Sequence, residues 1–400
     1  MFLSFTARYL INVESLNGVG SVGNISRHRS APLVVKVDNG YAVKYFPVVS
    51  GESIAHGYQV LLAEIGKEKK LPIGKRSING ELLKFTDDYL LEEEGIEPPK
   101  VPKADKGKKA KKEKAAKIAK IEMRRLEVEI MLKDYVSDVG GFLYAGDIPV
   151  KRTSVFQVSY MVPAYGVSAE VASLEAQLHV RYSSTFKLSE QSEEQSERKK
   201  NEESEEEEEE RGRAYQLPYS VDVGSALYSV TFNIDLDHIA VPSNAGVNED
   251  EIKDDSELEG MLKNLKDNEA KLARQKADRQ EVALLAFARL FENLEFGAKK
   301  SRFFPQATLE EAVITLTDKP FVVTPSVVNN YLTSTEKRLT KMTSLGLVSP
   351  MVLGVIGVKN PPSAFQEYSS IAEAVDAVIK AIKEGKKNDS KKNEHGDQAS

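Results

Sequence analysis

The chain has 400 residues and a mass of 44.3 kDa, which allows two or three domains, or one core with large insertions. It contains no cysteine, which excludes disulfides, thiol nucleophiles and cysteine-ligated metal sites. The net charge of −6 is concentrated in three tracts: residues 189–211 hold twelve acids and four bases, residues 248–259 hold seven acids and one base, and residues 100–120 hold ten lysines and two acids.

Tracts of like charge do not bury apolar area and tend to stay solvated. We interpret the acidic tract at 189–211 as a surface loop rather than as a specific docking site. Two interpretations of the lysine tract stay open, a solvated helix extension or an arm that attracts the phosphates of nucleic acid. Apolar runs such as 282–288 are far shorter than the roughly 18 residues of a membrane span, and the N-terminus does not resemble a secretory signal. We therefore expect a soluble, cytoplasmic protein without membrane contact.

The N-terminal part of the chain predicts strands and one helix. Residues 2–13 alternate apolar and polar side chains, which is typical of a half-buried strand, and the glycine-rich stretch 14–32 predicts a loop. Asp38-Asn39-Gly40 separates two apolar runs and predicts a hairpin turn. Ser50 is a candidate N-cap for a helix over residues 51–66. That helix would bury Ile54, Tyr58, Leu61, Leu62 and Ile65.

The rest of the chain alternates between helical and strand patterns. Helices are predicted at 114–136, 257–295, 326–340 and 370–384. Gly140-Gly141 would end the first of these helices. Strands are predicted at 154–162, 174–183, 226–236, 309–316 and 351–358. The tail from about residue 385 is polar and predicted to be disordered.

This order predicts an α+β fold on an antiparallel sheet with inserted helical and hairpin elements, because a doubly wound parallel fold would need regular strand–helix alternation. The predicted organisation is a first part of the core at 1–66, a helical insertion with the lysine tract at 67–137, the remainder of the core at 138–360, and a C-terminal helix and tail at 361–400. Within the third part lie an acidic disordered loop at about 186–214 and a charged helical segment at about 248–295.

The sequence gives little support to catalysis. It contains no phosphate-binding loop, no dinucleotide fingerprint and no His-Glu-x-x-His motif. Asp235 and Asp237 flank Leu236 and could share a divalent ion, but we favour an exposed strand end. We predict no catalytic residue, no metal and no cofactor.

Four basic clusters on an otherwise neutral chain leave two interpretations open, a solvated rim or the binding of a polyanion. Glycines let backbone amides approach a ligand, and basic loops beside aromatic residues suit single-stranded RNA. The clusters are Asn17 and Asn24 with Arg27, His28 and Arg29; Lys151 and Arg152; His179 and Arg181; and Lys299, Lys300 and Arg302.

Seven blocks in chain order, within about residues 1–360, resemble one known family. They are Asn12–Pro32, Pro47–Gly57, Asp138–Leu143, Val150–Gln157, His179–Ser183, Val223–Tyr228 and Gly297–Phe303. Together they resemble the archaeal type I-A CRISPR Cascade backbone subunits, of the DevR-like branch of the RAMP superfamily. The lysine and acidic tracts look like insertions relative to compact members, and the aromatic signature of ordinary RNA-recognition motifs is missing.

The resemblance implies an RNA-recognition-motif-like (ferredoxin-like) core and a non-catalytic subunit that stacks head to tail along CRISPR RNA. Its partners would be that RNA, target DNA through guide pairing, other copies of the chain and other Cascade subunits. By resemblance, the glycine-rich loop, the Arg27–Arg29 group, Arg152, His179 and Lys299–Arg302 would face the RNA.

Two alternatives stay open. The first is a metal-independent endoribonuclease of the same superfamily that processes CRISPR precursor RNA, with His28 or His179 as a general base toward a ribose hydroxyl. The second is a scaffold that binds no nucleic acid.

Overall fold

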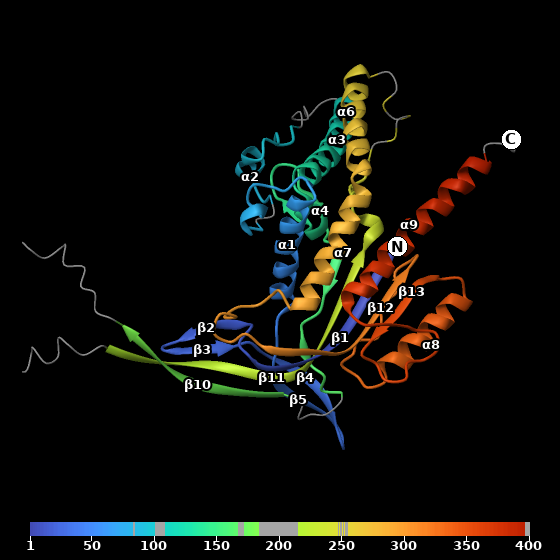
Figure 1. Cartoon of the computed structure of the whole chain (residues 1–400). Helices are drawn as coiled ribbons and strands as arrows, with labels where there is room; N and C mark the ends of the chain where they lie inside the picture. The colour runs from blue at the N-terminus through green and yellow to red at the C-terminus, as the bar shows by residue number, and fades with distance from the viewer. Residues whose placement is uncertain are drawn as a thin grey trace, which may run out of the picture.

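The computed structural model is a mixed α+β chain arranged around one large sheet (Figure 1). Its described backbone comprises residues 1–82, 85–100, 109–166, 172–183, 215–246, 248, 250, 252 and 255–396. The acidic loop predicted at about 186–214 lies outside the described residues, as does the part of the lysine tract between residues 101 and 108.

The strands are β1 (Phe2–Glu14), β2 (Gly18–Val22), β3 (Ile25–His28), β4 (Ser30–Val37), β5 (Gly40–Pro47), β6 (Phe142–Tyr144), β7 (Val150–Arg152), β8 (Phe156–Val158), β9 (Val162–Pro163), β10 (Ala172–Ser183), β11 (Tyr215–Asp235), β12 (Gln306–Thr317), β13 (Pro350–Ile356) and β14 (Gln366–Tyr368). The helices are α1 (Gly51–Glu68), α2 (Asp88–Glu93), α3 (Lys109–Lys133), α4 (Tyr135–Gly140), α6 (Ser256–Arg274), α7 (Lys276–Asn293), α8 (Tyr331–Ser344) and α9 (Ile371–Gly396). Short 3-10 turns lie at Ser77–Asn79 and Leu236–His238. Within the described ranges, no helix combines the length and the apolar character that crossing a bilayer requires.

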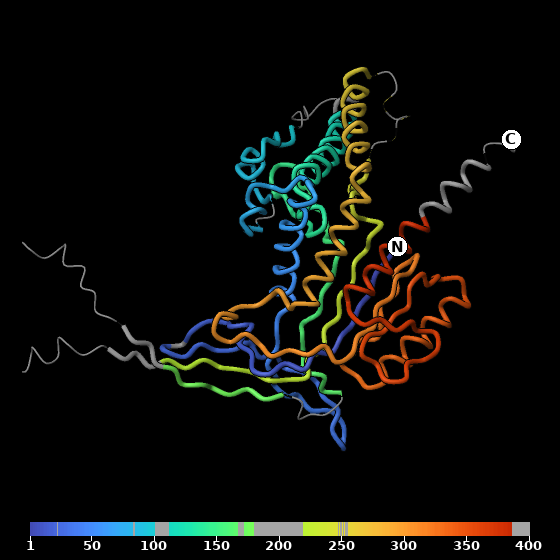
Figure 2. Tube along the Cα trace, in the orientation of Figure 1, coloured from blue at the N-terminus to red at the C-terminus, as the bar shows by residue number. Residues whose placement is uncertain are grey.

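The ten-stranded sheet has the order β14-β13-β12-β1-β11-β3-β2, and β8, β9 and β10 also pair with β11. Strand β1 is antiparallel to both of its neighbours, β11 and β12. The N-terminal half of β11 leaves this core and pairs with β10, forming an arm that projects away from the helices (Figure 1). Figure 2 shows β2 and β3 lying along this arm, with the loop before β12 beside them.

Strand β1 is confirmed, but the prediction that it is half-buried is wrong over most of its length. Its apolar face packs under the helices, where Phe5 lies 5.1 Å from the rings of both Phe287 and Phe291 of α7. Its polar face is also buried, because the segment before α8 covers it. Thr6 Oγ1 and Arg8 Nε both donate hydrogen bonds to Ser326, so the polar face is satisfied without water.

The prediction that residues 14–32 form a loop is also wrong. The stretch contains the β2–β3 hairpin, with Gly23 and Asn24 at its turn. Strand β3 forms because it pairs with β11, where Ile25 faces Ser220 and Ser26 faces Val221. Such pairing over about two hundred residues leaves no local pattern in the sequence.

The predicted β4–β5 hairpin at Asp38-Asn39-Gly40 is confirmed, as is helix α1. Ser50 Oγ accepts a hydrogen bond from the Ser53 amide, the expected N-cap geometry. All five apolar residues predicted to face the core from α1 are buried. The two long predicted helices are each divided, at Asp134 between α3 and α4 and at Gln275 between α6 and α7. Helix α9 continues to Gly396, past the predicted end at residue 384.

Helices α3 and α6 pack together away from the sheet (Figure 1). Their contact buries Ile118, Ile121 and Val128 of α3 against Leu258, Leu262 and Leu265 of α6. Lys114 Nζ lies 2.8 Å from carboxylate oxygens of both Asp255 and Glu257. The described end of the lysine tract is therefore helical, and at this residue it meets the acidic tract at 248–259.

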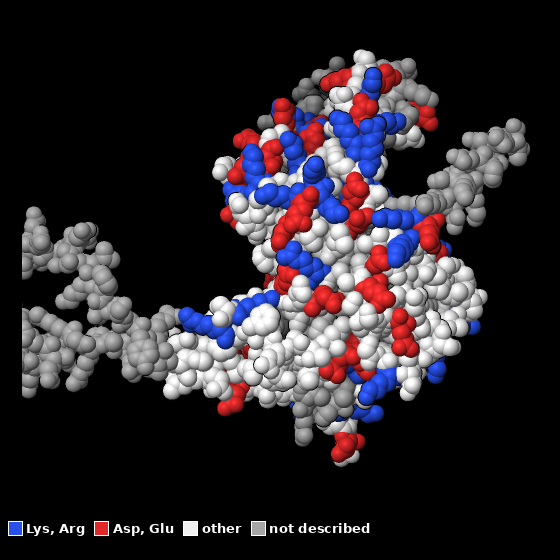
Figure 3. Space-filling model, in the orientation of Figure 1, with Lys and Arg blue, Asp and Glu red and all other residues white. Residues whose placement is uncertain are grey.

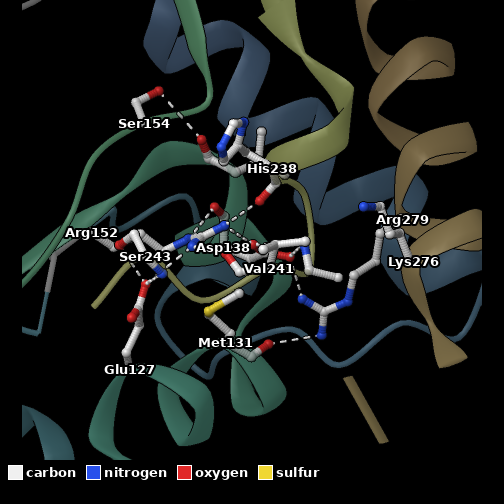
Figure 4. A network of polar contacts seen from close by, with 12 residues as sticks. Glu127, Met131, Asp138, Arg152, Ser154, His238, Val241, Ser243, Lys276 and Arg279 are labelled. Carbon is white, nitrogen blue, oxygen red and sulfur yellow. Dashed lines mark hydrogen bonds and ion pairs between the residues drawn. The ribbon is translucent and has the colours of Figure 1, made fainter. Parts of the chain in front are cut away.

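A buried ionic network joins this helical layer to the core (Figure 4). Asp138 of α4 pairs with Arg152 of β7 and lies 2.6 Å from Arg279 Nη1 of α7. Arg152 Nη1 also lies 3.2 Å from Glu127 of α3, and all four side chains are almost fully buried. Each charge is thus compensated where water cannot reach it, which the burial of an ion requires.

Replacing Asp138 by Asn leaves two buried guanidinium groups with one remaining carboxylate. We expect Asp138→Asn to lower the free energy of unfolding by about 3–5 kcal/mol, the usual effect of breaking a buried ion pair. Urea unfolding of both proteins measures the difference. Asp235→Asn is the matched control, because Asp235 pairs with the exposed His238 and such pairs contribute about 1 kcal/mol or less. Equal losses in the two variants would contradict the role given to the network.

Candidate nucleic-acid interface

Three segments that are far apart in the sequence meet at a hollow of about 670 Å³ on the arm. They are the β2–β3 hairpin, the N-terminal half of β11 and the loop between α7 and β12. The residues that line the hollow are Ser21, Gly23, Asn24, Ser26, Tyr219, Val221, Lys299, Ser301, Arg302 and Phe303. Figure 3 shows Lys and Arg side chains on this part of the arm.

The two cations that line the hollow are held by hydroxyl groups. Lys299 Nζ donates to Ser26 Oγ, which ties the basic loop to β3. Arg302 is exposed, and its Nη1 donates to the Tyr219 hydroxyl at 3.2 Å. Hydroxyls orient these side chains without neutralising them, so both charges are retained at the hollow.

Aromatic rings form one side of the hollow. Tyr219 and Phe303 line it, and His179 of β10 packs against both, with ring centroids 5.4 Å apart in each pair. His179 and Tyr219 are stacked at an interplanar angle of 28°. His179 Nε2 is buried and has no hydrogen-bond partner among the described residues. His179 therefore supports the aromatic wall through its ring.

A junction of backbone contacts fixes the basic loop against β2 and β3. The Ala298 amide donates to the Leu16 carbonyl at 2.7 Å, and the Arg29 amide donates to the Asn17 carbonyl at 2.7 Å. Asn17 Oδ1 accepts a hydrogen bond of 2.9 Å from the Ser50 amide, at the start of α1. The amide side chain of Asn17, predicted to contact RNA, is thus engaged in the scaffold.

His28 was also predicted to contact RNA, and the structure corrects this prediction. Its side chain is fully buried, with Nε2 2.8 Å from Glu14 Oε1 and Nδ1 2.7 Å from the Arg29 carbonyl oxygen. Burial alone would lower the pKa of His28, but the hydrogen bond and charge of Glu14 raise it above its ordinary value. His28 holds β3 to the end of β1 and does not face a ligand.

Arg152 is the second correction. Its side chain is 2% exposed and belongs to the network with Asp138 and Glu127, so it cannot reach a ligand at the surface. Its neighbour Lys151 is exposed but lies on β7, which pairs with β6 in a separate small sheet. Both residues were predicted for the same reason, local positive charge in the sequence. In the strand, successive side chains point to opposite faces, so Arg152 points inward and Lys151 outward.

The remaining predicted residues differ in position. Lys300 Nζ donates to the Leu294 carbonyl and lies 5.9 Å from the Phe296 ring, and burial lowers the pKa of this lysine. Arg27 is half-exposed and lies 3.7 Å from Asp222, whereas Arg29 is partly buried, with no described partner for Nε. The side chain of Arg181 lies outside the described part of the chain. Of the predicted set, the hollow brings together Asn24, Lys299 and Arg302, with His179 behind its wall.

Asp235 and Asp237 make local polar contacts at the end of β11, which is the interpretation that we favoured from the sequence. Asp235 accepts the Asp237 amide at 3.1 Å and His238 Nδ1 lies 2.8 Å from its other oxygen, while Asp237 pairs with the N-terminal amine. Across the described ranges, no group of three or more histidine, aspartate and glutamate side chains is placed to hold a metal ion.

Sequence reasoning missed Tyr219, Ser21 and Ser26 as members of the site. Phe303 was visible as an aromatic neighbour of the basic loop. Tyr219 and the serines carry no local signal, because they reach the hollow only through the pairing of β3 and β11.

Fold and site together define a mixed α+β protein with a cationic, aromatic-walled hollow on a projecting arm. A model of the family described as "CRISPR-associated negative auto-regulator DevR/Csa2" matches residues 5–336. The chain belongs to this family, which confirms the resemblance drawn from its sequence blocks.

Curated relatives agree with this assignment. "CRISPR-associated aCascade subunit Cas7/Csa2 2" of Saccharolobus solfataricus is 36% identical over 382 residues, which cover 96% of this chain and 99% of that protein. "CRISPR-associated protein Cas7/Csa2 1" of the same organism is 32% identical over 326 residues, covering 81% of this chain and 82% of that protein. A solved chain of a "CRISPR RNA-guided surveillance complex, pre-nicking" covers 95% of this chain and is itself covered completely, at 12% identity and a TM-score of 0.47, too low to support an argument.

Gly297 is a local test of how the basic loop is positioned. Its φ of +83° lies in the left-handed region, and an added Cβ would lie 2.9 Å from both Leu16 Cβ and the Leu16 carbonyl oxygen. We expect Gly297→Ala to cost about 1–3 kcal/mol of unfolding free energy, as for other strained backbone positions. Gly260 is the control, because it lies near the start of helix α6 in open space, where alanine should be neutral or stabilising. Thermal unfolding compares the two variants; an unchanged midpoint for Gly297→Ala would show that the junction tolerates displacement.

Proposed function

We propose that this chain is a non-catalytic subunit that binds the sugar–phosphate backbone of CRISPR RNA within a cytoplasmic surveillance complex. The observation that carries the proposal is the convergence of Lys299 and Arg302, both held by hydroxyls, beside the Tyr219 and Phe303 rings in one hollow. Cations track phosphates, and flat rings accept bases or sugars of any sequence. One relative is named as an aCascade subunit, which supports the same assignment.

Sequence-independent contact is what such a role requires. A subunit that must accept any guide has to hold phosphates and sugars, and base pairing with target DNA then supplies the specificity. We propose that copies associate head to tail along the RNA and contact other Cascade subunits. Two different surfaces in each contact would give an open helix rather than a closed ring.

The proposed core is RNA-recognition-motif-like. Support comes from the chain order β1, α1, β8, β11, α7, β12 and from the strand order β12-β1-β11-β8, antiparallel throughout. This order corresponds to the β-α-β-β-α-β order of the ferredoxin-like motif and supports the proposal, in which the arm and the other helices are additions.

Two observations favour a binding role over RNA cleavage. The endoribonuclease alternative relied on His28 or His179 as a general base, and a base must reach the proton that it removes. His28 is fully buried against Glu14, and His179 Nε2 is buried behind the aromatic wall. Incubation of the purified chain with labelled repeat RNA tests the alternative: site-specific cutting that His179→Ala abolishes would overturn the non-catalytic assignment.

The double variant Lys299→Ala, Arg302→Ala tests the hollow directly. We expect weaker binding of unrelated single-stranded RNAs by a similar factor, because the lost contacts are to phosphates. The slope of log K against log[salt] should become shallower by about 1.4, at roughly 0.7 per phosphate contact for single strands. Filter binding over a KCl series measures both.

Lys300→Ala is the matched control from the same loop, because Lys300 points to the Leu294 carbonyl and away from the hollow. It should keep the wild-type salt slope. A salt slope that is the same in the wild type, the double variant and the control would contradict binding at this hollow.

A further inference from the structure

A buried ion pair joins the end of β1 to the end of β3, one of the strands that line the hollow. The carboxylate of Glu14 and the ring of His28 are both fully buried, and Nε2 lies 2.8 Å and 2.9 Å from the two carboxylate oxygens. The Leu16 amide donates to Glu14 Oε2 at 2.6 Å, and the Tyr228 hydroxyl donates to Oε1 at 2.7 Å. The carboxylate of Glu14 thus links the end of β1 to β3 and β11.

With Glu14 ionised, the contacts of the His28 ring are those of an imidazolium, which carries a proton on each nitrogen. Nε2 faces a carboxylate that already accepts an amide and a hydroxyl, and Nδ1 lies 2.7 Å from the Arg29 carbonyl oxygen. Neither oxygen carries a proton to donate, so a neutral ring would direct one bare nitrogen at an acceptor. The imidazolium satisfies both contacts.

The segments that this pair fixes lead directly to the hollow. Leu16, held by Glu14, accepts the hydrogen bond from Ala298, the residue before Lys299. His28 ends β3, which carries Ser26, the hydroxyl partner of Lys299. A shift of either partner would therefore move the basic loop relative to β3.

We propose that the Glu14–His28 pair is the positioning device of the hollow, so that loss of the second ring proton loosens the loop that carries Lys299 and Arg302 and weakens RNA binding. This inference rests on the proposed function. His28 is a positioning residue here, because it acts through Leu16 and Ser26 and touches no ligand.

The charged and titratable groups around the ring come from three strands. Glu14 belongs to β1, Asp222 and Tyr228 to β11, and Arg27 to β3, while Arg29 directly follows β3. Asp222 accepts the His28 amide at 3.2 Å and lies 3.7 Å from Arg27. Asp222 is an acid that also favours the protonated ring, and Tyr228, whose pKa is raised mainly by burial, stays neutral.

The direction of the pH dependence follows from the two pKa shifts. The pKa of His28 in the folded chain is raised above 6.5. The stabilisation that the ion pair contributes is therefore complete below pH 6.5 and is lost as the pH rises through the folded pKa. Burial opposes ionisation of Glu14, but the hydrogen bonds from His28, Leu16 and Tyr228 lower its pKa below 4.5. On the acid side, the stabilisation by the ion pair is therefore lost only below pH 4.5. RNA affinity should therefore decline on the alkaline side.

The test is a pH series of RNA affinity at fixed ionic strength for the wild type and for His28→Gln. The variant keeps a hydrogen-bonding side chain but cannot carry the charge. We expect it to bind roughly 5- to 150-fold more weakly near pH 6, the usual range of coupling between sites, and the two affinities to converge in alkali. His238→Gln is the matched control: it removes an exposed histidine–carboxylate pair away from the hollow and should follow the wild type. An affinity ratio of wild type to His28→Gln that stays at one throughout would overturn the proposal.

A second measurement on the wild-type chain does not depend on whether the variant folds. At a pH above the ordinary histidine pKa, nitrogen NMR of selectively labelled histidine should show one ring with both nitrogens protonated. A neutral His28 ring at that pH would overturn the proposal. Failure of the proposed function can be distinguished from failure of this inference. If the proposed function is wrong, the wild type binds no RNA, or its RNA binding is unchanged by the double variant Lys299→Ala, Arg302→Ala, while the NMR spectrum still shows a doubly protonated His28 ring.

Discussion

The continuity of β11 is the constraint on which the rest of the structure depends. Its C-terminal half pairs with β1 and places Tyr228 and Phe232 in the core, and its N-terminal half pairs with β10 and β3 and places Tyr219 in the hollow. A two-stranded ribbon is only marginally stable alone. The arm is therefore ordered near its base by what packs on it, namely the β2–β3 hairpin and the loop that carries Phe303.

The same chain uses its cations in two opposite ways. Arg152 and Arg279 are buried, and their charges are compensated by Asp138 and Glu127, so they stabilise the junction between helices and sheet. Lys299 and Arg302 are held by hydroxyls at the surface, which orients them while leaving their charge available. The identity of the partner, carboxylate or hydroxyl, separates a structural cation from a candidate binding cation.

Local chemistry made part of this structure predictable. The turn at Asp38-Asn39-Gly40, the N-cap Ser50 and the apolar face of α1 depend on neighbours within a few residues, and all three were correctly predicted. The β2–β3 hairpin was not, because β3 is stabilised by pairing with β11, far away in the sequence. The burial of His28 and Arg152 was missed for the same reason: their partners Glu14 and Asp138 lie fourteen residues away, at positions that only the fold brings together.

The convergence at the hollow also bears on how strongly one copy would bind. Two cations and two rings offer few contacts, each weakened by salt or shared with water. If copies line up along one strand, every further copy adds its contacts at high effective concentration, so the array binds tightly although each hollow binds weakly. Weak individual contacts also suit a guide of arbitrary sequence, because no single site then rejects a base. A chain whose charges outside the three tracts balance, with Lys299 and Arg302 held by hydroxyls at the hollow, fits this requirement better than a uniformly basic surface would, since general basicity attracts every polyanion in the cell.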